Sequence, residues 1–72
     1  MTEEIESLVH GFIKNRHNKG ETTASRHIHI RFDMEFVKIE KILKNLVQKR
    51  LVSKLYEKEY QEDRFAPIPV KE

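Results

Sequence analysis

The sequence predicts a small α+β domain in which three helices precede a two-stranded β-hairpin, and two neighbouring segments carry most of that prediction. Between Phe36 and Val47 the apolar residues recur at helical spacing and fall on one face, while the opposite face is polar and basic. The segment LVSKLY, which begins at Leu51, then alternates between its two sides as a strand does. A polar stretch at 57–63 and the segment FAPI follow, so a turn and a returning strand complete the predicted hairpin.

The first helix is predicted to run from the N-terminal region to about Asn18. Five apolar residues follow the spacing of one helix face: Ile5, Leu8, Val9, Phe12 and Ile13. Gly20 is expected to stop this helix, because glycine readily adopts the left-handed conformation found at helix ends.

Residues 24–32 fit two interpretations. As a helix, they place Ala24, Ile28 and Phe32 on one buried edge at four-residue spacing. As a strand, the segment HIHIRF alternates polar and apolar residues with a period of two. The helix is favoured by its context, because a compact helix, a turn at Asp33 and a third helix over about 35–49 reproduce the spacing of a helix-turn-helix.

Composition limits the classes of protein. The chain has no cysteine, which excludes disulfides and thiolate-based zinc sites. No apolar stretch approaches the roughly 20 residues that cross a bilayer, and the acidic N-terminal region is unlike a secretory signal. A soluble, intracellular (cytoplasmic) protein with no membrane partner is therefore expected.

Positive charge is concentrated in the middle of the chain. Residues 23–50 contain seven Lys and Arg against three acidic residues, a net charge of +4, whereas 1–22 and 51–72 each carry −1. Because attraction to a polyanion depends on clustered charge, this distribution is more informative than the total of +2. Simple solubilisation of a helix face is the alternative explanation.

A set of core positions and a Leu-x-x-Leu-x-x-x-x-Leu-Val run lie between residues 23 and 68: Ile28, Phe32, Met34, Ile39, Leu43, Leu46, Leu51 and Val52. This pattern resembles the winged helix-turn-helix superfamily of small bacterial, archaeal and viral regulators. The resemblance implies an α+β winged helix-turn-helix fold with three helices and a two-stranded β-hairpin wing. From its length, the chain is predicted to form a single domain over residues 1–68, followed by a flexible C-terminal tail at 69–72.

The chain departs from that superfamily at four places. His29 stands where a small residue is usual, which adds weight to the strand interpretation of 24–32. Asp33 and Arg50 stand where glycine is usual, although Asp tolerates a left-handed turn at modest cost. The glycine before the second wing strand is missing, and the wing segment 57–63 is acidic on balance. A wing that lies along phosphates is generally basic.

The resemblance implies that the third helix enters the major groove of DNA. Its polar face supplies the expected base contacts: Val37, Glu40, Lys41, Lys44 and Gln48. Arg26, Arg31 and Lys38 are expected to hold phosphates. On the wing, Lys58 and Arg64 are the remaining candidates for DNA contact.

Catalysis and metal binding are not expected. No nucleophile with a base, no glycine-rich phosphate loop and no paired acids stand out, so the chain is predicted not to be an enzyme and to need no cofactor. His27 and His29 are two residues apart, a spacing that would let them share an ion from a strand but not from a helix. Together with His10 and His17, they are interpreted as surface histidines.

Two functions stay open. The first is a transcriptional regulator that binds double-stranded DNA, expected as a homodimer because one small domain buries little DNA surface. The first helix or the tail would supply the dimer surface. The alternative is a winged-helix module that binds a protein partner in a replication, transcription or translation assembly, which the acidic wing and Val37 favour.

Overall fold

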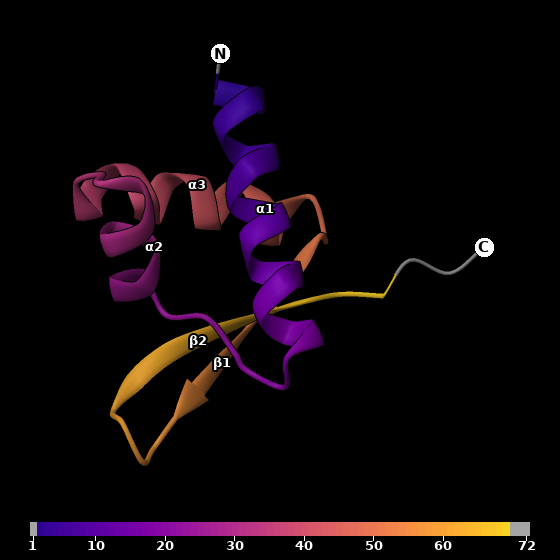
Figure 1. Cartoon of the computed structure of the whole chain (residues 1–72), viewed down its shortest axis with the longest axis vertical. Coiled ribbons are helices and arrows are strands. Elements are labelled where there is room, and N and C mark those ends of the chain that lie inside the picture. Colours follow the sequence, from indigo (N-terminus) through magenta and orange to yellow (C-terminus); the bar gives the residue numbers. More distant parts are fainter. Residues whose placement is uncertain (1, 70–72) are drawn as a thin grey trace.

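The computed structural model of the chain describes residues 2–69 and contains five elements. They are α1 (Thr2–Asn18), α2 (Ser25–Phe32), α3 (Phe36–Gln48), β1 (Val52–Glu57) and β2 (Glu62–Pro67) (Figure 1). Figure 1 shows α2 and α3 beside the upright α1, with the hairpin below the helices. The predicted α+β layout of three helices followed by an antiparallel hairpin is confirmed. The tail predicted at 69–72 lies, apart from Pro69, outside the described residues.

The segment with two interpretations is a helix. Ile28 is completely buried, whereas Ile30 is among the most exposed apolar side chains of the described residues. A strand would have placed both on one side, since its side chains repeat every two residues. Ala24, Ile28 and Phe32 form the inner edge of α2, as the helix interpretation predicted.

Every element contributes to one hydrophobic core. The buried members are Val9, Ile13, Ile28, Met34, Ile39, Ile42, Leu43, Leu46, Val52 and Phe65. Phe36, expected on the buried face of α3, is instead half exposed. It lies at the first turn of α3, where its ring stacks on His29 of α2 rather than entering the core.

The returning strand begins earlier than predicted. Glu57 pairs with Glu62 and Tyr56 with Asp63, so the acidic residues after the turn belong to the ladder. A further short pairing extends this sheet. Thr23 exchanges both backbone hydrogen bonds with Phe65, at 3.1 and 2.7 Å, on the edge of β2 away from β1.

Each connection between elements uses one residue with a positive φ angle. Gly20 follows α1 at φ 81°, Asp33 follows α2 at 54°, Arg50 follows α3 at 61°, and Gln61 precedes β2 at 52°. Three of these four residues stand at or near places where the superfamily pattern has glycine. At Asp33, Arg50 and Gln61 the backbone is left-handed although a side chain makes that conformation less favourable than it is for glycine.

Candidate nucleic-acid interface

The outward face of α3 is exposed and mainly polar. Val37 is 66% exposed, and Lys41, Lys44 and Gln48 are exposed beside it. The inner face of the same helix is buried, because Ile39, Ile42, Leu43 and Leu46 pack into the core. Within the described residues, neither Lys41 nor Lys44 has an ion-pair partner, so their charges are directed to solvent.

One edge of α3 is fixed against α1. Asn45 Nδ2 donates a 2.9 Å hydrogen bond to Glu6 Oε2, and Lys49 Nζ donates one of 2.8 Å to Glu6 Oε1. Glu6 is a buried carboxylate, and the bond from Lys49, then that from Asn45, hold the pKa of Glu6 below its usual value. This clamp sets the direction of α3 on the core.

The other edge of α3 faces the hairpin across a groove of about 370 Å³. Its apolar walls come from Leu43, Val47 and Phe65. Its polar lining comes from Ser25, Glu40, Lys44, Gln48, Lys54 and Asp63. Glu40, Lys44 and Gln48 thus lie on the hairpin side of α3.

The turn between α2 and α3 is held by His29. Its Nδ1 lies 2.6 Å from the carbonyl oxygen of Met34, so this nitrogen carries the proton and donates. The imidazole stacks on Phe36 with ring centroids 4.5 Å apart and an angle of 18°. His29 therefore fits where the superfamily pattern has a small residue, because it bridges the turn instead of pressing between the helices.

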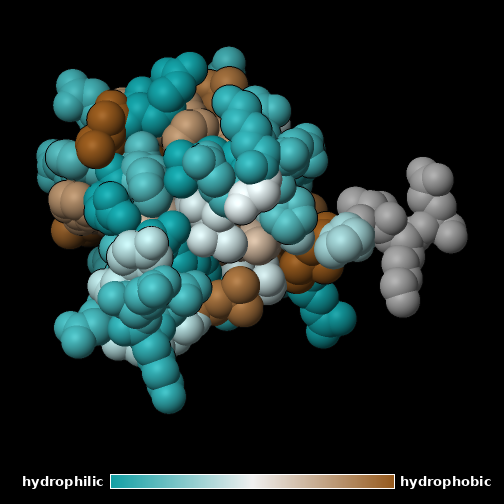
Figure 2. Space-filling model, turned by 60° about the horizontal axis from the view of Figure 1, so that its bottom comes forward, coloured by the Kyte–Doolittle hydropathy of each residue, from teal (hydrophilic) through white to brown (hydrophobic). Residues whose placement is uncertain are grey.

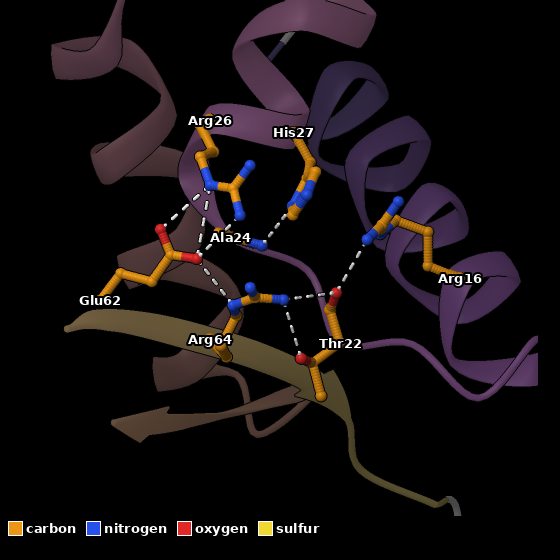
Figure 3. A network of polar contacts seen from close by, with 7 residues as sticks. All are labelled: Arg16, Thr22, Ala24, Arg26, His27, Glu62 and Arg64. Atoms are coloured by element: carbon orange, nitrogen blue, oxygen red, sulfur yellow. Dashed lines mark hydrogen bonds and ion pairs between the residues drawn. The ribbon is translucent and has the colours of Figure 1, made fainter. Parts of the chain in front are cut away.

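The start of α2 is held by His27. The backbone N–H of Ala24 donates a 3.0 Å hydrogen bond to His27 Nδ1 (Figure 3), which closes the first turn of the helix. Burial, followed by the charges of Arg16, Arg26 and Arg64, lowers the pKa of His27. The imidazole is accordingly kept in the neutral form that can accept this bond.

Glu62 joins α2 to the hairpin (Figure 3). Arg26 Nε donates to Glu62 Oε1 at 3.1 Å, and Arg26 Nη2 donates to Oε2 at 3.3 Å. Arg64 Nε lies 2.8 Å from the same Oε2. Arg26, expected to hold phosphate, is exposed but already bound to a carboxylate.

Arg64 is not available for DNA in this structure, contrary to the sequence-based expectation. Arg64 is only 8% exposed, and its Nη1 donates to the hydroxyl and carbonyl oxygens of Thr22 at 3.2 and 3.4 Å (Figure 3). Arg16 of α1 donates to the same carbonyl at 3.1 Å. Arg64 thus ties β2 to the segment between α1 and α2.

The remaining predicted contacts are all exposed. Arg31 lies with its guanidinium carbon 5.3 Å from the Phe32 ring centroid, and Lys38 extends from the first turns of α3. Lys58 lies in the hairpin turn, where Glu57 and Glu59 flank it in sequence. Figure 2 shows one face of the molecule as mainly hydrophilic with separate small hydrophobic areas.

Sequence reasoning missed the roles of His27, His29 and Thr22. A local sequence signal existed only for His27 and His29, whose hydrogen-bond partners are three and five residues away along the chain.

The described residues contain no group of three His, Asp or Glu side chains arranged for a metal ion. In the same part of the chain, the helices are too short or too polar to cross a membrane.

Comparison with known proteins gave no match to a family model, to a curated protein or to a solved structure.

Proposed function

We propose that this chain is a winged helix-turn-helix protein that binds double-stranded DNA as a transcriptional regulator, with α3 in the major groove. The observation that carries the proposal is the outward face of α3, where Val37, Lys41, Lys44 and Gln48 are all exposed. An α-helix fits the width of the major groove, and these side-chain types match the edges that bases present there. The three-residue connection from α2 and the hairpin after α3 support the same assignment.

The charges of α3 are suited to this role. Lys38, Lys41 and Lys44 have no ion-pair partner among the described residues, so binding a phosphate would break no existing pair. Arg31 is exposed at the end of α2 and can hold a phosphate beside them. Arg26 is different, because it must leave Glu62 before it can contact DNA.

The acidic hairpin is less repulsive than its sequence suggests. Glu62 is paired with Arg26 and Arg64, and Asp63 lies 3.4 Å from Lys54 Nζ. These pairs neutralise two of the acids of the hairpin, of which Asp63 lines the groove.

The test is reversal of two charges on α3 with a matched control. Lys41→Glu combined with Lys44→Glu should lower affinity for a pool of random duplexes by at least about tenfold, since the change removes two positive charges that face the polyanion and adds two negative charges in their place. The control, Lys14→Glu combined with Lys19→Glu, makes the same charge change at exposed positions in α1 and after it. Fluorescence anisotropy between about 50 and 200 mM salt measures both affinity and salt slope.

Two results would contradict the proposal. Absence of duplex binding by the unmodified protein at about 50 mM salt would remove DNA as the partner. Equal loss of affinity in the α3 variant and in the α1 control would show a general charge effect with no role for the face of α3.

A protein-binding module is the second candidate, and two exposed apolar residues favour it. Ile30 is 77% exposed on α2 and Val37 is 66% exposed on α3, so each could contact an apolar group of a partner. If duplex binding is absent, Ile30→Ser and Val37→Ser become the variants with which to test binding to a candidate protein.

A further inference from the structure

Strand β1 has an edge with no backbone partner in the described residues. The two-stranded sheet has the order β1-β2, and the additional pairing with Thr23 lies on the far edge of β2. The open edge of β1 is therefore the place where another extended segment can add to the sheet.

The direction of the free backbone groups follows from the pairing of Phe65. Its N–H and C=O both bond to Thr23, so they point away from β1. Lys54 is opposite Phe65, and in an antiparallel ladder the two residues of such a pair both direct their backbone groups outward. Lys54 and Tyr56 thus present their N–H and C=O groups at the open edge, while Leu55 bonds to β2.

The side chains leave this edge accessible. Leu55 is 47% exposed and Tyr56 is 63% exposed, and β1 contains no proline. A lysine in the middle of an edge strand commonly prevents pairing. Here, however, the Lys54 ammonium is paired with Asp63 of β2, which draws its charge back over the sheet.

We propose that β1 pairs in antiparallel register with β1 of a second copy of this chain, about a twofold axis at Leu55. Lys54 then lies opposite Tyr56 of the second copy, and the two residues exchange both backbone hydrogen bonds. Leu55 faces its own counterpart at the axis, where the side chains of a non-hydrogen-bonded pair approach closely. The result is a continuous four-stranded sheet across two molecules.

The sequence of the edge favours a second copy as the occupant. In this register the aliphatic stem of Lys54 lies opposite the aromatic ring of Tyr56, and the hydroxyl of Ser53 faces the carboxylate of Glu57. Moving the axis to Lys54 would place two ammonium groups opposite each other. Moving it to Tyr56 would place Lys54 opposite Lys58, so like charges oppose both neighbouring registers.

This proposal does not depend on DNA binding, and it is tested without DNA. Sedimentation equilibrium of the full chain should show a concentration-dependent change from 8.7 kDa to twice that mass. Leu55→Lys and Leu55→Glu should each be monomeric, because each places like charges face to face at the axis. An equimolar mixture of the two variants should recover the dimer, since the charges are then opposite.

Two further variants define the edge. Tyr56→Pro removes an outward N–H that β2 does not use, so the fold is retained and two hydrogen bonds per dimer are lost. The dimer Kd should rise roughly thirtyfold. Leu8→Lys, which changes an apolar residue 56% exposed on α1, should leave the Kd unchanged.

Three outcomes would overturn the proposal. A protein that stays monomeric at millimolar concentration has no such interface. A dimer that persists in both Leu55 variants uses another surface. A dimer that is lost on Leu8→Lys but not on Tyr56→Pro is formed through α1.

Discussion

Replacement of Arg50 by glycine should stabilise the protein, because Arg50 has the left-handed backbone conformation at φ 61°. That conformation costs a residue with a side chain about 1–2 kcal/mol, and glycine avoids this cost. Glycine also gives the unfolded chain more freedom, which takes back roughly 0.4–1 kcal/mol. The side chain of Arg50 is exposed, and its backbone N–H donates to the Val47 carbonyl at 3.0 Å, a bond that glycine keeps. The net gain is about 0.5–1 kcal/mol.

The gain can be measured by thermal and urea unfolding followed by circular dichroism. For a domain of this size, about 0.5–1 kcal/mol corresponds to a rise in Tm of roughly 2–8 °C. Arg50→Ala is the control, because it removes the same side chain while keeping the Cβ that makes the conformation unfavourable. A Tm for Arg50→Gly that is equal to or below that of Arg50→Ala would show that backbone strain at this connection is not what limits stability.

Three further predictions concern the charged groups. Folding stability should fall as the pH drops below about 6.5, because the pKa of His27 is lowered in the folded protein and the unfolded chain therefore binds the proton more readily. The His27→Ala variant should be about 1 kcal/mol less stable at pH 8, because it loses the capping hydrogen bond, and its stability in urea titrations should depend less on pH. Glu6→Gln should lower the urea midpoint of unfolding at neutral pH but have little effect in acid. The reason is that the ionised Glu6 carboxylate, whose pKa is lowered in the folded protein, stabilises the fold only until the pH falls through the ordinary glutamate range and below it. On the proposed DNA interface, Glu62→Gln should free Arg26 to contact a phosphate and raise the salt slope of duplex binding by about one. The control, Glu59→Gln, changes the same charge without releasing an arginine. Equal salt slopes for the two variants would show that Arg26 makes no phosphate contact after its release.

The long helices could be predicted because their apolar spacing has no competing interpretation. The inner face of α3 is formed by Ile39, Ile42, Leu43 and Leu46, as its period of 3.6 residues requires. The segment HIHIRF fits the periods of both a helix and a strand, so only its packing against the rest of the fold decides which of the two it forms. The deciding fact is that one residue, Ile28, enters the core while Ile30 stays in solvent.

The polar contacts of the candidate site could not be predicted from spacing. Arg26 and Glu62 are 36 residues apart, and Arg64 and Thr22 are 42 apart, so no local pattern links them. Arg64, predicted as a candidate for DNA contact, is instead buried, and its charge is used inside the fold. His27 and His29 carried a local signal, since their partners lie three and five residues away, but a capping histidine resembles any polar residue at the start of a helix.

The effect of the acidic residues of the hairpin on DNA binding depends on where they lie and on whether they are paired, and not only on how many there are. Asp63 lines the groove next to α3, Glu62 lies opposite Glu57 at the start of β2, and both Asp63 and Glu62 have a cationic partner within the fold. Glu57 and Glu59 have none among the described residues, and they lie at the turn end of the hairpin. A phosphate backbone would therefore meet uncompensated negative charge at the tip and compensated charge beside α3. If α3 enters a major groove, this difference favours an approach in which the helix carries the contact and the tip of the hairpin stays away from the phosphates.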